Sequence, residues 1–162
     1  MPMETYTVRR FCAEDADAVV AMIARNMREV NSKDYPPEFI EEEIRTLNKE
    51  WLLGRSQWTH AYVVCDGDTV VGHGAIGPYW GSETESCLFT IFVLPEYHGQ
   101  GIGRAIIQTL EQDEFFLRAN RVEIPASITA REFYRRMGYS YKNGVETPDE
   151  EGICRMEKFR KI

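Results

Sequence analysis

The most informative stretch of the chain is LFTIFVLPEYHGQGIGRA, residues 88–105. Its β-branched and aromatic residues predict a buried strand over 88–94, which ends because Pro95 cannot continue it. Glycines follow at positions 99, 101 and 103, and a helical pattern begins near Arg104. Bare backbone N–H groups at the mouth of a helix, together with the helix dipole, form a site for an anion such as a phosphate.

The spacing of these glycines argues against two common nucleotide-binding motifs. A Rossmann fingerprint requires G-x-G-x-x-G, but Arg104 and Ile106 occupy the position of the third glycine counted from Gly99 and from Gly101. A P-loop requires a Gly-Lys-Ser/Thr sequence that the chain lacks. The glycines alone leave open a tight turn that binds no ligand.

Outward from this stretch, hydrophobic periodicity predicts an α/β fold in a single domain over residues 1–162. Hairpin signals predict antiparallel strand pairs within 60–76 and within 139–159. Strands are expected over 5–9, 60–65, 69–76, 121–124, 139–145 and 153–159, and helices from residue 13 and over 38–53, 104–119 and 129–137. Gly54 is expected to end the second helix.

Composition narrows the classes of function. The chain has 26 acidic and 19 basic residues, a formal charge of -7, which disfavours binding to nucleic acid or to an anionic membrane. The N-terminus carries no export signal and no apolar run is long enough to span a bilayer, so a cytoplasmic protein is expected. Four scattered cysteines and three histidines match no metal-binding spacing, and we expect no metal.

Residues 88–105 resemble the acetyl-CoA signature of the GCN5-related N-acetyltransferase (GNAT) family: a strand ending in Val-x-Pro, then Arg/Gln-x-x-Gly-x-Gly/Ala opening a long helix. A second stretch, SITAREFYRRMGY at 127–139, resembles the family's block Asn-x-x-Ala-x-x-Phe/Leu-Tyr-x-x-x-Gly-Phe/Tyr. The expected element order over essentially the whole chain also agrees with the family's fold. The resemblance implies a central, mixed and mostly antiparallel sheet that is splayed at strand 88–94 and has helices on both faces. It also implies acetyl transfer from acetyl-CoA to a primary amine of a small molecule or protein by direct attack.

The resemblance also implies which residues bind acetyl-CoA. Backbone groups of the strand would bind the pantetheine arm, loop amides would cradle the pyrophosphate, and the second block would border the cofactor. These residues are Ile91, Phe92, Val93, His98, Gly99, Gln100, Gly101, Ile102, Gly103, Arg104, Ser127, Ala130, Phe133 and Tyr134. His98 and Ser127 depart from the family's usual Arg/Gln and Asn, but both keep hydrogen-bonding capacity.

Tyr134 holds the position where the family usually keeps a general acid, which would protonate the departing thiolate; the alternative is a core tyrosine. The amine must lose a proton to a base, and the strand position where relatives carry a carboxylate is held by Cys87. We therefore predict Glu85, two residues earlier on the same strand face, as the catalytic base, with Glu83 as an alternative. Cys87 as a nucleophile and His73 as a residue of the substrate channel are further alternatives.

The acceptor is not identified by any motif. The negative charge favours a cationic amine, such as a polyamine, an aminoglycoside, or a protein lysine or N-terminus. Segments 31–37 and 77–86 are expected to shape its pocket, and an assembly into a homodimer is left open. Two other hypotheses are a catalytically silent coenzyme A sensor and a purely structural domain.

Overall fold

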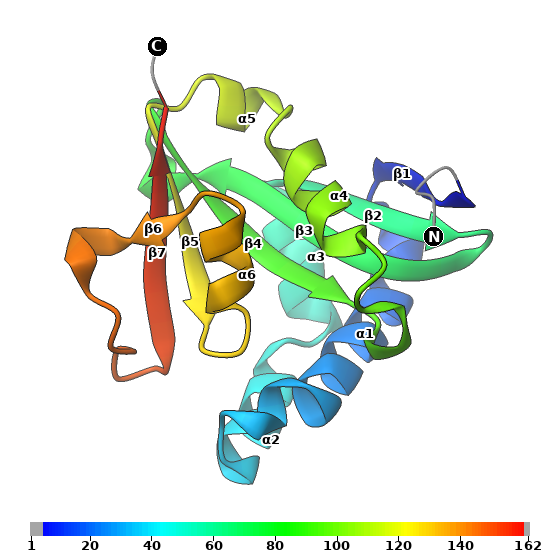
Figure 1. Cartoon of the computed structure of the whole chain (residues 1–162). Coiled ribbons are helices and arrows are strands. Elements are labelled where there is room, and N and C mark those ends of the chain that lie inside the picture. Colours follow the sequence, from blue (N-terminus) through cyan, green and yellow to red (C-terminus); the bar gives the residue numbers. More distant parts are fainter. Residues whose placement is uncertain (1–4, 161–162) are drawn as a thin grey trace.

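The computed structural model describes residues 5–160, and residues 1–4, on which the predicted lack of an export signal rests, lie outside this range together with 161–162. A seven-stranded sheet in the order β1-β2-β3-β4-β5-β7-β6 forms the centre (Figure 1). Neighbouring strands are antiparallel except β4 and β5, which run parallel. The strands are β1 (Thr7–Arg10), β2 (His60–Asp66), β3 (Thr69–Pro78), β4 (Glu85–Val93), β5 (Arg121–Ser127), β6 (Ser140–Tyr141) and β7 (Ile153–Phe159). The predicted mixed, mostly antiparallel sheet is confirmed.

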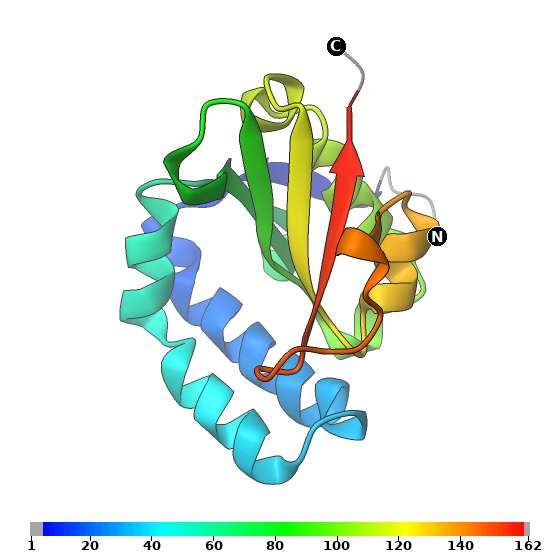
Figure 2. The same cartoon turned by 90° about the vertical axis from the view of Figure 1, so that its left-hand side faces the viewer.

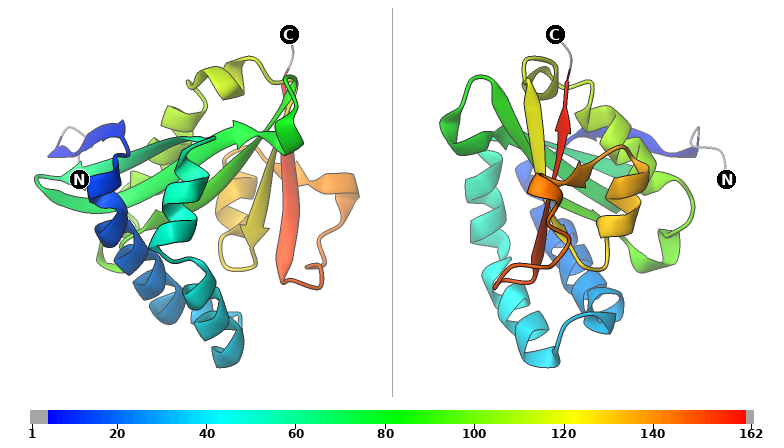
Figure 3. Two further views of the ribbon diagram at one scale, coloured as in Figure 1. Left: turned by 180° about the vertical axis from the view of Figure 1, so that it is seen from behind. Right: turned by 60° about the vertical axis from the view of Figure 1, so that its left-hand side comes forward.

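Helices cover both faces of the sheet, as expected for an α/β fold (Figures 1 and 3). One face carries α1 (Ala16–Glu29), α2 (Pro37–Thr46) and α3 (Lys49–Ser56). The other carries α4 (Ile102–Leu110), α5 (Glu114–Leu117) and α6 (Arg131–Arg136). The two faces bury separate apolar clusters, because alternate strand residues point to opposite sides of the sheet.

The helix predicted over 38–53 is wrong in its length, because the chain forms two helices there. At Leu47 the backbone leaves the helical region, and the side chain of Asn48 then accepts a hydrogen bond of 3.0 Å from the Trp51 N–H. This N-cap begins a new helix, α3. Gly54 lies inside α3, so the prediction that it ends the helix is also wrong.

The helix predicted over 104–119 is likewise divided. It ends at Leu110, and Asp113 caps the short helix α5 by accepting from the Phe115 N–H at 2.9 Å. The predicted strand 139–145 is wrong beyond Tyr141, since Lys142–Gly144 form a helical turn with Asn143 at φ 56°. β4 begins three residues earlier than predicted, at Glu85.

The parallel strands β4 and β5 pair over three residues only, Glu85–Cys87 with 121–123, and diverge beyond that point (Figures 1 and 2). Among residues 5–160, the edge of β4 that faces β5 therefore has no strand partner after Cys87. The register with β3 shifts between His73 and Ala75, opposite Thr90, which has a φ of 53°. The predicted splay of the sheet at this strand is confirmed.

The helical layer bridges the open end of the splay. The Asn26 amide of α1 donates a hydrogen bond to the Val93 carbonyl at the end of β4. The Tyr35 hydroxyl, on the segment between α1 and α2, accepts from the Ile128 N–H at 2.8 Å, just beyond β5, and donates to the Gly152 carbonyl. These contacts tie both diverging strands to one short part of the chain.

Candidate active site

The glycine loop leads from β4 into the N-terminus of α4. Gly101 is the N-cap and has a φ of 83°, a left-handed conformation that glycine adopts without steric cost. The first bond into the helix runs from the Ala105 N–H to the Gly101 carbonyl, at 3.0 Å. Within residues 5–160, the amide N–H groups from Gly99 to Arg104 donate to no protein acceptor. Six donors thus remain at the positive end of a helix, where an anion is stabilised.

Close packing on β3 fixes the position of this loop. A Cβ atom at Gly74 would clash with the side chain of Ile106, so the bare backbone lets α4 lie directly against the strand. Phe133 of α6 packs against Gly103, and its ring meets that of Tyr134 edge-on at 5.3 Å between centroids. The two sequence blocks that carry the family resemblance are therefore in contact.

Two side chains of the loop have protein partners. The Nε2 of His98 donates to the Val93 carbonyl at 2.9 Å, and the Oε1 of Gln100 accepts from the Tyr6 hydroxyl. Both contacts hold the loop in place. Arg104 is exposed at the first turn of α4. At the end of β5, the Ser127 hydroxyl accepts from the Ala130 N–H at 3.1 Å and shapes the turn into α6.

A cavity of about 90 Å³ lies in the splay. Its walls come from β4, β5 and α6, and are formed by Leu88, Phe89, Thr90, Ile91, Phe92, Ile124, Pro125 and Tyr134. Burial raises the pKa of Tyr134, so its side chain is a neutral phenol with a proton to donate. No residue in the described range accepts a hydrogen bond from its hydroxyl.

Predicted acidic and thiol groups of β4 lie at the closed end of the splay. Glu85 is half-buried, and its Oε1 accepts from Nη1 of Arg121 at 3.1 Å, outside the wall of the cavity. Glu83 is exposed in the preceding loop. Burial, aided by the charge of Glu123, raises the pKa of Cys87 to about 12, so it stays a thiol and is a poor nucleophile.

His73 does not line the cavity. Its Nδ1 donates to the Thr90 carbonyl at 2.7 Å, its ring meets Phe11 edge-on at 5.6 Å, and its buried Nε2 has no partner in the described part of the chain. Burial lowers its pKa to about 4. His73 thus supports the kinked part of β4 from the face that carries α1.

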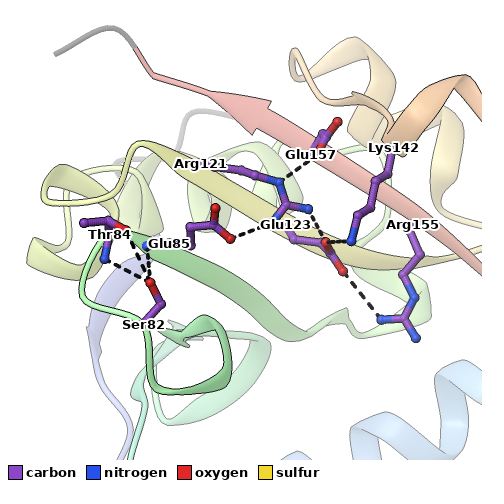
Figure 4. A network of polar contacts seen from close by, with 8 residues as sticks. All are labelled: Ser82, Thr84, Glu85, Arg121, Glu123, Lys142, Arg155 and Glu157. Atoms are coloured by element: carbon purple, nitrogen blue, oxygen red, sulfur yellow. Dashed lines mark hydrogen bonds and ion pairs between the residues drawn. The ribbon is translucent and has the colours of Figure 1, made fainter.

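Sequence reasoning missed a charged network around Glu123, which is 1% exposed (Figure 4). Its carboxylate contacts Arg121, Lys142 at 2.9 Å and Arg155 at 3.6 Å. Burial alone would raise the pKa of Glu123, but hydrogen bonds from Lys142 and Arg121 outweigh it and lower the pKa. Two charged residues within the otherwise apolar strand 121–124 were the one signal in the sequence.

We also searched residues 5–160 for a larger cavity, a metal site and a membrane-spanning helix. A larger hollow of about 540 Å³ lies between β1, β2 and α4 and contains none of the predicted site residues. No group of three or more His, Cys, Asp or Glu in this range is arranged to hold a metal ion. No helix in it is long and apolar enough to cross a bilayer.

Comparison with known proteins agrees with this geometry. A model of the acetyltransferase (GNAT) family matches residues 24–139. No relative with a curated description matches the chain.

Solved structures are similar in fold at low sequence identity. PaiA N-acetyltransferase from Thermoplasma acidophilum, in complex with coenzyme A, is 19% identical, with a TM-score of 0.81 over 96% of this chain and 99% of that one. A GCN5-related N-acetyltransferase from Rhodopseudomonas palustris is 21% identical, with a TM-score of 0.78 over 99% of both chains. Ard1 from Thermoplasma volcanium is 15% identical, with a TM-score of 0.68 over 96% of this chain and 97% of that one.

The family model covers more than half of the sequence, and the splayed sheet and the two motif blocks lie together as the resemblance implied. The chain therefore belongs to the GNAT acetyltransferase family.

Proposed function

We propose that the protein transfers an acetyl group from acetyl-CoA to the primary amine of a small molecule or protein. The observation that carries the proposal is the row of six free amides at the mouth of α4, next to the unpaired edge of β4. The diphosphate of acetyl-CoA can accept hydrogen bonds from such N–H groups. Its pantetheine arm, which carries amides, can lie along a free strand edge as an added strand does. The complex of the similar PaiA structure with coenzyme A supports this assignment.

The cavity in the splay is of a size for the acetyl end of the cofactor rather than for the whole molecule. Tyr134 forms part of its wall, and its neutral hydroxyl has no competing acceptor in the described range. We assign this hydroxyl as the acid that protonates the leaving thiolate. The hydrophobic side chains of the wall lower the local dielectric constant, which strengthens such a hydrogen bond.

For the base we assign Glu85, which shares a strand face with Phe89 of the cavity wall and would take the proton of the amine through water. The cavity wall itself contains no carboxylate among residues 5–160, and this observation favours the second candidate function, a coenzyme A sensor without catalysis. Turnover distinguishes the two functions, since both require coenzyme A binding.

The test is a thiol-release assay with acetyl-CoA and a panel of amines, peptides and aminoglycosides. Tyr134→Phe is expected to lower kcat about 100-fold and to leave the affinity for coenzyme A within about twofold. Tyr139→Phe is the matched control, because its buried hydroxyl contacts Glu111 at 3.0 Å and lies outside the cavity wall. Coenzyme A binding without amine-dependent release would support the sensor, and no binding at all would reject both functions.

A further inference from the structure

The C-terminal turn of α3 holds an arginine in an aromatic setting. The guanidinium carbon of Arg55 lies 4.5 Å from the ring centroid of Phe89, 4.7 Å from that of Trp51 and 5.6 Å from that of Trp58. Burial lowers the pKa of Arg55. In residues 5–160 its guanidinium donates no hydrogen bond and pairs with no carboxylate. A half-buried cation with five unused N–H donors carries a cost in free energy, which the binding of an anion would offset.

The cations of the network around Glu123 are already paired (Figure 4). Arg121 binds Glu85 and Glu157, and Lys142 binds Glu123. Arg155 lies 3.5 Å from Asp149 and 3.6 Å from Glu123. The carboxylates of this network are therefore occupied by their own partners, and the charge of Arg55 remains uncompensated.

Arg55 contacts a residue of the cavity wall. Phe89, whose ring it covers, forms part of the cavity wall together with Tyr134. The glycine loop and α4 lie on the opposite face of the sheet, and α3 lies behind β3 and β4 (Figures 1 and 3). Because the cofactor would approach from the α4 side, we expect the amine to approach from the α3 side (Figures 1 and 3), where Arg55 lies.

We propose that Arg55 binds an anionic group, a carboxylate or a phosphate, carried by the amine that is acetylated. This inference rests on the proposed acetyltransferase function. A guanidinium presents parallel N–H donors that match both oxyanions, and the aromatic rings around Arg55 fix its plane. The negative net charge of the chain favoured a cationic acceptor, but a partly desolvated charge near the reacting amine has the stronger effect on binding.

The experiment compares matched acceptors in the thiol-release assay. Phenylalanine, methionine and lysine are each paired with the amine that lacks the carboxylate, namely phenethylamine, 3-(methylthio)propylamine and cadaverine. O-Phosphoethanolamine is paired with ethanolamine. At least one acceptor with an anionic group is expected to have a kcat/KM about tenfold or more above that of the matched amine without it, and the pair that responds identifies carboxylate or phosphate.

Arg55→Gln is expected to remove this preference through an increase in KM of about 10- to 100-fold for the acceptors with an anionic group, with little change for the amines without one. Arg55→Lys keeps the charge without the fork and should retain part of the preference. Arg10→Gln is the control, since Arg10 also lies over an aromatic ring, that of Tyr62 at 5.4 Å, but is on β1 at the edge of the sheet. It is expected to keep the full preference.

Thermal stability and coenzyme A affinity, measured for each variant, separate loss of recognition from loss of fold. If Arg55→Gln does not fold, the wild-type protein provides the test: 3-phenylpropionate or ethyl phosphate should inhibit competitively against the amine and not against acetyl-CoA. Equal kcat/KM for acceptors with and without the anionic group, or no such inhibition, would overturn the role of Arg55 and leave the proposed function intact. Thiol release from no amine at all would instead contradict the proposed function.

Discussion

The imidazole of His73 donates a hydrogen bond of 2.7 Å to the carbonyl of Thr90, the residue at which β4 adopts a φ of 53°. A β-branched residue in this conformation is strained, and a partner that holds its carbonyl compensates for the strain. The kink opposite the register shift is also where β4 turns its free edge toward the splay. One buried histidine thus supports the shape of the cofactor strand without touching the cavity.

This contact predicts a dependence of stability on pH. Burial lowers the pKa of His73 from 6.5 to about 4, so the unfolded chain binds a proton that the folded chain excludes in this range. The contribution of His73 to stability is complete above pH 6.5 and decreases as the pH falls toward 4, by up to about 3 kcal/mol. Urea unfolding between pH 4 and 7 measures it. His73→Asn should flatten the curve in this window.

Binding of coenzyme A should depend on a single backbone donor of the glycine loop. Arg104 is the third residue of α4, where proline is tolerated because the N–H has no helical partner. Arg104→Pro and Arg104→Ala both remove the side chain, but the proline also removes the amide. We expect Arg104→Pro to bind coenzyme A about tenfold more weakly than Arg104→Ala by calorimetry. Equal affinities would show that this amide does not contact the diphosphate.

Replacement of two glycines by alanine should change the free energy of unfolding in opposite directions, because only one of them lies under a close helix. Gly74→Ala should lower the free energy of unfolding by about 1–3 kcal/mol, because its Cβ would clash with Ile106. Gly54→Ala should raise it by about 0.5–1 kcal/mol, since Gly54 is inside α3 and a Cβ atom there would meet no other atom within 4 Å. Denaturant unfolding compares the two, and a stable Gly74→Ala protein would contradict the packing argument.

Removal of the buried charge of Glu123 should destabilise the protein. Glu123→Gln leaves Arg121 and Lys142 without their shared carboxylate, at an expected cost of about 2–4 kcal/mol. Glu132→Gln is the control, because the Glu132–Arg135 pair is exposed and its loss should cost less than about 1 kcal/mol. Similar stabilities of the two variants, measured by chemical denaturation, would show that the network around Glu123 contributes little.

The local features of the fold could be predicted from the sequence because neighbouring residues determine them. The alternating apolar run of β4, Pro95 and the glycines after it define a strand, a stop and a helix mouth within 18 residues. The breaks before α3 and α5 carried a local signal too. Asn48 and Asp113 are typical N-caps, but the apolar period continued past both and favoured unbroken helices.

The surroundings of the site could not be predicted because they depend on contacts between distant parts of the chain. Asn26 reaches Val93 across 67 positions, and Tyr35 reaches Ile128 across 93. Nothing in the sequence near Arg55 indicates that it covers Phe89, and only the pairing of β5 with β7 brings Arg155 to Glu123. Such pairings follow from the order of strands in the sheet.

The hydrogen bonds of Asn26 and Tyr35 connect the diverging ends of β4 and β5 through one segment of the chain. The distance between the two strand ends can therefore change only if one of these hydrogen bonds breaks or the segment itself moves. The width of the splay is thereby determined before any ligand binds, and the residues that determine it lie in the first quarter of the chain. We therefore expect coenzyme A to bind without a large change in the shape of the splay, and we expect substitutions in the segment between α1 and α2 to weaken its binding.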